Sequence, residues 1–361
     1  MPHKWRLAAL KTKMKSIDEQ NVNPRSFILH WSSKHKKWLE TIVYTVFVLM
    51  GQSIATLLGR LYFSKGGKSI WLLTLVQTIG FPVLLPFLLF APTQTSKDTE
   101  KTHLKLALLY TSLGIFLAIL CILYSIGLLY LPVSTYSLIC ASQLGFNAVF
   151  AFFLNQQKLT PYIMNSIFIL TLSTILLVIQ GDSSESIYTS KRRYTFGFVC
   201  TISASAGYAL LLSLTQLSYQ KIVKDESFRA VLSMIIYQSM VSSFVIVIGI
   251  FASGDWKMLR GEMMEFELGE VLYVMILVSK AVSWQIFSIG IMGLTFKVTS
   301  LFSNVVSTVG LPIVPILAVV FFHDEMSGVK IVSMVMAVWG FLSYLYQHYL
   351  DHTKAESQNR D

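Results

Sequence analysis

The chain has 361 residues, of which 54% are of the types AVILMFWYC and only 13% are charged, and its mean hydropathy is +0.60. Soluble proteins carry about a quarter charged residues, so this composition excludes a soluble globular domain. A net charge of +10 would suggest nucleic acid binding in a soluble chain, but in a membrane chain it reflects topology, and no nucleic acid partner is expected.

The chain opens with a basic segment, residues 1–37, which holds nine Lys and Arg residues against two acids. It has neither the apolar run nor the small-residue cleavage site of a signal peptide. We therefore expect a cytoplasmic tail here and a second, shorter one at residues 350–361.

Ten apolar runs of about 20 residues follow, which is the length that crosses a hydrocarbon core of about 30 Å. The predicted spans cover residues 38–58, 70–91, 104–124, 131–153, 159–179, 196–217, 230–251, 271–292, 298–321 and 329–349. The sequence therefore predicts an all-α integral membrane protein with ten transmembrane helices, embedded in the lipid bilayer.

Charge sets the expected orientation. With the N-terminus in the cytoplasm, 19 Lys and Arg residues fall in cytoplasmic segments and nine in segments on the other side. Cytoplasmic loops carry the excess of basic residues in membrane proteins, so both termini are expected to be cytoplasmic.

An internal repeat relates the fourth and ninth spans. Residues 133–135 (VST) match 298–300 (VTS), and residues 142–145 (SQLG) match 307–310 (STVG). Because five helices per repeat is an odd number, the two halves, residues 38–180 and 196–349, must have opposite orientations in the membrane, joined by a loop at 181–195. Inverted repeats are typical of secondary transporters, whose substrate site lies near the midplane.

Catalytic chemistry has little support. All acidic residues fall in loops, tails or span ends, no Gly-rich phosphate loop precedes a helix, and the three cysteines lie in apolar runs without metal-ligand spacing. An intramembrane enzyme needs such groups or a nucleophile beside a base. We expect no enzyme activity, no metal and no cofactor.

The polar groups within the spans are mostly amides, hydroxyls and aromatic rings, which suit a neutral, flat, hydrogen-bonding solute. Helical spacing places the fourth-span candidates on one face, and the others lie in the second, eighth and ninth spans. The candidate substrate-binding residues are Trp71, Gln77, Tyr136, Gln143, Asn147, Trp284, Gln285 and Asn304. The alternatives are helix–helix hydrogen bonding for the amides and interfacial anchoring for Trp71 and Tyr136.

Lys280 differs from these residues because it is a cation in the middle of a span, at a cost of at least about 3 kcal/mol. It is the candidate coupling residue, which would take up and release a proton. The alternatives are a contact with an anionic substrate, or a position in a wet cavity beside backbone carbonyls.

Several motifs resemble those of the plant purine permeases, a family of the drug/metabolite transporter superfamily. They are GGKSIWLLTLVQ at 66–77, YLPVSTYSLICASQL at 130–144, FNAVF at 146–150, WQIFS at 284–288, LFSNVVS at 301–307 and LPIVP at 311–315. The resemblance implies ten helices in two inverted five-helix halves and proton-driven import of adenine, cytokinins and related heterocycles, often at the plasma membrane.

The sequence therefore predicts a proton-coupled secondary transporter that imports purine nucleobases and related heterocycles by alternating access, with possible homo-oligomerisation left open. One alternative is an exchanger of an anionic metabolite such as a nucleotide sugar or sugar phosphate. The other is a membrane receptor that binds a hormone without transporting it.

Overall fold

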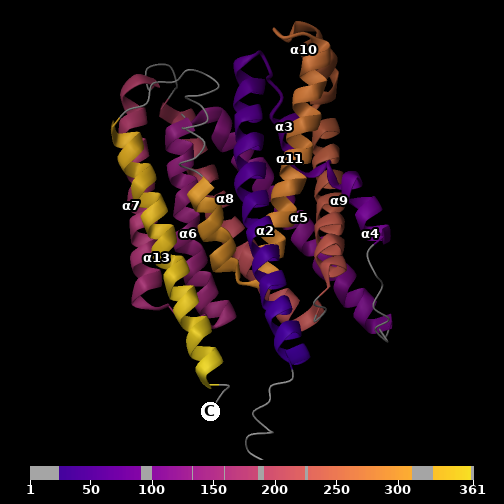
Figure 1. Ribbon diagram of the computed structural model, residues 1–361. Helices are drawn as coiled ribbons and strands as arrows, with labels where there is room; N and C mark the ends of the chain where they lie inside the picture. Colours follow the sequence, from indigo (N-terminus) through magenta and orange to yellow (C-terminus); the bar gives the residue numbers. More distant parts are fainter. Residues whose placement is uncertain are drawn as a thin grey trace, which may run out of the picture. The chain divides into compact units, whose positions relative to one another are not determined.

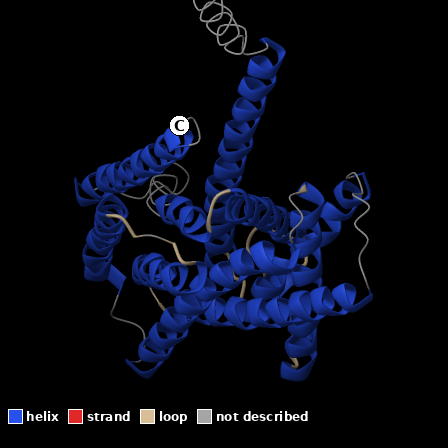
Figure 2. Cartoon of the chain, turned by 90° about the horizontal axis from the view of Figure 1, so that it is seen from below, coloured by secondary structure: helices blue, strands red, loops and turns tan. Residues whose placement is uncertain are grey.

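The computed structural model describes residues 24–90, 100–131, 133–157, 159–185, 191–223, 227–310 and 328–358. These residues form helices and turns without any strand (Figure 2), so the all-helical class is confirmed. The chain divides into two units, Met1–Val43 and Tyr44–Asp361, and every contact below lies within the second. Most of the predicted N-terminal tail lies outside the described residues.

Helices occupy most of the described part of every predicted span (Figure 1). They are α2 (Pro24–Ser64), α3 (Ile70–Thr78), η1 (Phe81–Leu84), α4 (Leu85–Phe90), α5 (Glu100–Tyr130), α6 (Val133–Asn155), α7 (Pro161–Glu185), α8 (Lys191–Ser218), η2 (Tyr219–Val223), α9 (Phe228–Ser253), η3 (Asp255–Lys257), α10 (Leu259–Glu265), α11 (Glu270–Lys297) and α13 (Gly328–Gln358). Residues 300–310 are also helical.

Within the described residues, six helical stretches are long and apolar enough to cross a membrane. They are Trp38–Ser64, Ile70–Phe90, Leu104–Tyr130, Arg192–Val223, Phe228–Ser253 and Glu270–Lys297. They coincide with the first, second, third, sixth, seventh and eighth predicted spans. The ninth predicted span, 298–321, lies partly outside the described residues.

The second predicted span is not one continuous helix. α3 ends at Thr78, and a short 3-10 turn containing Pro82 follows before α4 begins. Pro82 has no N–H and its ring clashes with the preceding turn, so an α-helix does not run through it. Gly80 suits the break because α11 passes close by: a Cβ atom on Gly80 would lie 2.7 Å from the carbonyl oxygen of Ala281.

Helices of the two predicted halves pack against one another. α3 contacts α5, α9 and α11, and α5 also contacts α8 and α9. α6 lies against α7 and α8, and α7 lies against α13. The main hydrophobic core includes Leu144, Leu211, Leu232 and Val305, which are fully buried. The two halves of the sequence are therefore not two separate bundles.

The start of α11 is tied to α2 and α3 through one buried carboxyl group. Oε1 of Glu262 accepts hydrogen bonds from the Tyr62 hydroxyl and, at 3.1 Å, from the Tyr273 hydroxyl, while its Oε2 accepts the Ser69 N–H at 3.0 Å. Glu262 is only 6% exposed. These four residues form the Glu262 cluster, and Figure 1 shows its helix, α10, where α11 begins.

The end of α11 adjoins a cluster of different chemistry. Oε1 of Gln216 accepts hydrogen bonds from Nδ2 of Asn155 at 3.0 Å and from the N–H of Ser300 at 2.8 Å. These three residues form the Gln216 cluster. Beside it, the hydroxyls of Thr295 and Ser303 lie 2.8 Å apart. With a rise of 1.5 Å per residue, Tyr273 and Thr295 are about 33 Å apart along α11, close to the thickness of a hydrocarbon core.

Candidate functional site

An internal cavity of about 170 Å³ lies between these two clusters along α11. A cavity needs about 10–15 Å³ to hold one water molecule, so this one has room for about ten waters or a small two-ring heterocycle. Its lining combines apolar, aromatic and hydrogen-bonding side chains. The lining residues are Gln52, Ala55, Thr56, Leu73, Gln77, Thr78, Leu117, Leu120, Cys121, Tyr124, Ser125, Leu128, Tyr136, Cys140, Gln143, Tyr208, Ser239, Lys280, Trp284, Phe287, Ser288 and Ser307.

Five residues singled out from the sequence line this one cavity: Gln77, Tyr136, Gln143, Lys280 and Trp284. They come from three helices, α3, α6 and α11. Residues far apart in the sequence thus converge on a single cavity, as the side chains that form a ligand-binding site do.

The Gln143 side chain is held by residues of two other helices. Its Nε2 donates to Oδ1 of Asn304 at 2.8 Å, and its Oε1 accepts from the Tyr124 hydroxyl at 3.0 Å. Nδ2 of Asn304 also donates to the backbone carbonyl of Gln143 at 3.2 Å. Because both ends of the amide are engaged, the orientation of Gln143 is fixed, and each end keeps one hydrogen-bonding position.

Gln77 belongs to a shorter chain of hydrogen bonds. Its Nε2 donates to the Ser125 hydroxyl at 3.1 Å, and the Thr74 hydroxyl donates to the same oxygen at 2.6 Å. The chain joins α3 to α5 beside the cavity, next to the helix break after Thr78. Gln77 keeps its Oε1 acceptor for another partner.

Aromatic rings make up much of the remaining wall. Tyr124 meets Tyr136 and Tyr208 edge to face, with ring centroids 6.2 and 6.4 Å apart. Trp284 and Phe287 meet in the same way at 5.3 Å. The Trp284 Nε1 is buried without a hydrogen-bond partner among the described residues, so an unsatisfied donor lies beside the cavity.

The other four candidates do not line the cavity. The Trp71 ring packs on α9 where Gly249 leaves space. Nδ2 of Asn147 donates to the Ala209 carbonyl at 3.1 Å. Nε2 of Gln285 lies 3.4 Å from the Thr78 carbonyl, which the break after α3 has freed from its helical partner. Asn304 contacts Gln143, as described above.

The structure also brings in residues that the sequence did not single out. Gln52 lines the cavity, and its Oε1 accepts from the Ser307 hydroxyl at 2.7 Å. Tyr124, Tyr208 and Phe287 line it as well. Gln52 could have been identified from the sequence, because it is a polar residue within the first apolar run. Tyr124, Tyr208 and Phe287 could not, because aromatic side chains are common in membrane spans.

Lys280 is 3% exposed and lines the cavity. Among the described residues, no carboxylate lies within ion-pairing distance of its Nζ, and no acceptor forms a hydrogen bond with it. The alternative of bonding to backbone carbonyls therefore finds no support among the described residues. No group of three or more His, Cys, Asp or Glu in the described residues could hold a metal ion.

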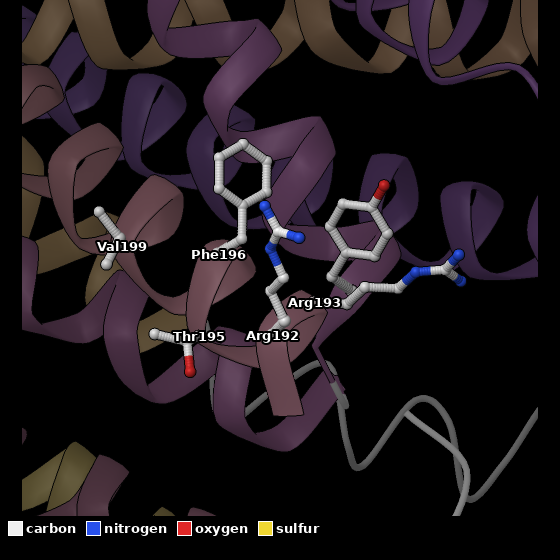
Figure 3. A pocket seen from close by; sticks show the side chains of 6 residues that line it. Arg192, Arg193, Thr195, Phe196 and Val199 are labelled. Atoms are coloured by element: carbon white, nitrogen blue, oxygen red, sulfur yellow. The ribbon is translucent and has the colours of Figure 1, made fainter. Parts of the chain in front are cut away.

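A second, wider pocket of about 990 Å³ lies where α8 begins (Figure 3). Tyr130, Arg192, Arg193, Thr195, Phe196 and Val199 line it. Arg192 and Arg193 are exposed, and Figure 3 shows Arg192 beside Phe196. Exposed guanidinium groups are suited to anions at a wet surface, whereas enclosure by aromatic and amide groups suits a neutral heterocycle. The internal cavity is therefore the candidate substrate site.

Comparison with known proteins agrees with this geometry. The family model described as purine nucleobase transmembrane transport matches residues 39–354. Purine permease 21 of Arabidopsis thaliana is 54% identical over 346 residues, covering 95% of this chain and 89% of that protein. Probable purine permease 10 of the same plant is 52% identical over 339 residues, covering 92% and 87%. A solved crystal structure that is 14% identical aligns with a TM-score of 0.56 over 84% of this chain and 97% of that one, a likeness of fold alone.

Proposed function

Since the chain belongs to the purine nucleobase transporter family, we propose that it imports adenine, cytokinins and related heterocycles with protons by alternating access. It is a transporter rather than an enzyme. The observation that carries the proposal is the internal cavity, because its volume and lining suit a flat, neutral heterocycle with hydrogen-bonding edges.

In the proposed complex the aromatic groups hold the faces of the base and the amides read its edges. Tyr124, Tyr136 and Trp284 supply the aromatic surface, and Gln77 and Gln143 supply the hydrogen bonds. The fixed orientation of Gln143 supports this assignment, because an amide that is already ordered loses little entropy on binding. In this proposal Asn304 acts through Gln143, and Asn147, Gln285 and Trp71 act through helix packing.

We extend the proposal to the architecture: ten crossings in two inverted five-helix repeats, residues 38–180 and 196–349. The helices described at each predicted span support it, as does the sequence repeat between the fourth and ninth spans. The hydrogen bond between Gln143 and Asn304 joins those two repeat partners. A site between equivalent helices is typical of inverted-repeat carriers.

We further propose that both termini face the cytoplasm and that the carrier acts at the plasma membrane. The distribution of 19 against nine basic residues supports the orientation. In this orientation the Glu262 cluster faces the outside and the Gln216 cluster faces the cytoplasm.

Lys280 is our proposed coupling residue. A buried ammonium in the middle of a span is costly, and among the described residues Lys280 has no carboxylate partner and the cavity lining holds no other cation. Its neutral form is therefore accessible, and proton uptake there changes the charge of the substrate site itself. This supports a role in coupling.

Uptake of radiolabelled adenine into cells that lack their own purine carrier tests the function. We expect saturable accumulation that increases as the external pH falls and that a protonophore abolishes, since accumulation needs the proton gradient. Excess cytokinin should compete. Saturable association without accumulation would instead indicate a receptor, and accumulation unaffected by protonophore would remove proton coupling.

The variant Lys280→Met separates coupling from substrate binding. If Lys280 carries the proton, the variant loses accumulation against a gradient but still exchanges labelled for unlabelled adenine. Lys221→Met, at an exposed position on η2, is the matched control and should behave like the parent. A Lys280→Met variant with the parent's pH profile would contradict the assignment.

The same variant tests the alternative of an anion exchanger. This alternative is favoured over the receptor because Lys280 is the one cation among the described residues that line the cavity. An anionic substrate would depend on Lys280 for binding, so Lys280→Met would lose exchange as well as accumulation. The parent would then transport neutral adenine poorly. A single ammonium is a weak site for a phosphate, which usually requires several cationic or N–H donors.

A further inference from the structure

Gly59, on α2, lies directly against the head of the Lys280 side chain. A Cβ atom built on Gly59 would collide with Nζ of Lys280 and lie 3.7 Å from its Cε, and apart from the backbone of α2 itself no other atom of the described residues falls within 4 Å of that position. Gly59 therefore leaves a space that only the end of the lysine side chain occupies.

Two other glycines between α2 and α11, Gly51 and Gly290, serve a different purpose. A Cβ on Gly51 would lie 2.6 Å from the backbone nitrogen of Phe287, and one on Gly290 would lie 2.7 Å from the carbonyl oxygen of Tyr44. At these positions the backbones of two helices approach closely, which small residues permit in membranes. Gly59 touches no backbone of another helix, so close helix packing does not require a glycine there.

A glycine in a helix interior is less favourable for helix stability than an alanine, so keeping a glycine at position 59 reduces the stability of α2. The lysine head that fills this space has no partner among the described residues. If a methyl group filled the space, the ammonium would have to move toward the cavity, because the cavity is the unfilled volume beside it.

We propose that Gly59 is a positioning residue that keeps the Lys280 ammonium against α2 and out of the volume that the substrate occupies. This inference rests on the proposed function of the cavity. Gly59→Ala would displace the charge into the cavity that Gln77 and Gln143 also line, without separating the helices, since the displaced atoms are the flexible end of a side chain. The expected result is weaker binding of a neutral base.

A double-mutant cycle between Gly59→Ala and Lys280→Met tests the geometry by melting temperature in detergent. In the Lys280→Met background the space is empty, so Gly59→Ala should raise the melting temperature by about 2 °C through better helix propensity. With Lys280 present it should give no rise or a fall. The control is Gly145→Ala, where a Cβ would meet nothing within 4 Å, and its effect should be the same in both backgrounds.

The transport arm uses the same variants with adenine exchange, which does not require a gradient. Gly59→Ala should raise the KM about tenfold in the parent and less than about twofold in Lys280→Met. Equal effects of Gly59→Ala in both backgrounds, on melting and on KM, would overturn the positioning role. If the parent does not transport adenine at all, the proposed function fails, while the melting cycle still decides whether Gly59 positions Lys280.

Discussion

The two ends of α11 are joined to their neighbours by different chemistry. At the Glu262 cluster one buried carboxyl group collects two tyrosine hydroxyls and a backbone N–H, and exposed ion pairs surround it. At the Gln216 cluster a neutral amide accepts two N–H groups. A carboxyl group that loses its donors while buried is far more costly than an amide that does so.

This difference matters for alternating access, in which each end separates in turn. The Gln216 cluster can open at a cost of weak, neutral hydrogen bonds, which average about 0.6 kcal/mol between membrane helices. The Glu262 cluster must either expose its carboxyl group to water or exchange its partners. We expect the Glu262 end to contribute more to the stability of the protein and to be the slower end to open.

The largest expected effect is that of Glu262→Ala, which leaves the hydroxyls of Tyr62 and Tyr273 and the N–H of Ser69 without their acceptor. We expect a loss of about 3 kcal/mol. The buried thiols of Cys121 and Cys200 allow unfolding to be followed with a thiol-reactive dye. Glu265→Ala, an exposed position on the same helix, is the matched control and should change stability by less than about 0.5 kcal/mol.

Should Glu262→Ala fail to fold, Tyr273→Phe removes a single donor from the cluster and should cost about 1 kcal/mol. If Glu262→Ala instead melts at the same temperature as Glu265→Ala, the buried carboxyl group does not stabilise this end, and the contrast between the two ends disappears.

At the opposite end, Gln216→Leu should have a smaller effect. It removes the acceptor for Asn155 and Ser300, and we expect a loss of about 1 kcal/mol, within the range measured for hydrogen bonds between membrane helices. The effect should be the same at low and high salt, because no charge is involved. Among the described residues, the hydroxyl of Ser218 bonds only within its own helix, to the carbonyl of Leu214, so Ser218→Ala is the control. A loss of stability as large as that caused by Glu262→Ala would show that the two ends of α11 do not differ in their contribution to stability.

The all-helical class is confirmed, and six of the ten predicted spans coincide with described helices long and apolar enough to cross a membrane, because lipid requires long apolar segments whose backbone groups bond within the helix. The sequence placed the ends of the spans less well. The eighth span was expected to end at residue 292, whereas α11 continues to Lys297, since a helix continues beyond its apolar run while its backbone bonds persist. Hydropathy also missed the break after α3, although Gly80 and Pro82 were visible.

The cavity was harder to predict because its lining depends on how each helix is rotated. Gln143 and Asn147 share one face of α6, yet α8 covers Asn147 through the Ala209 carbonyl while Gln143 lines the cavity. Spacing within one helix cannot show which neighbour covers which turn. Lys280 and Trp284 were identifiable because a mid-span cation and a tryptophan beside an amide are unusual whatever the rotation.

The smallest expected effect concerns the exposed ion pairs around the Glu262 cluster. Nζ of Lys68 lies 3.2 Å from Glu265, with both side chains 71% exposed, and Nζ of Lys65 lies 3.0 Å from Glu267, with side chains 37% and 59% exposed. Exposed pairs contribute about 0–1 kcal/mol. Double-mutant cycles to alanine should give a coupling energy below about 0.5 kcal/mol for each pair, with the less exposed Lys65 pair the stronger.

High salt sharpens this last test, because at 1 M the Debye length is only about 3 Å, comparable to these N–O distances. The coupling energies of both pairs should fall toward zero, while the loss caused by Glu262→Ala should persist, since its hydrogen bonds are buried and poorly screened. The backbone bond from the Glu267 N–H to the Lys65 carbonyl, at 3.2 Å, also persists and keeps the loops together. If high salt instead abolished the effect of Glu262→Ala, the stability of this end would come from its surface charges and not from the buried carboxyl group.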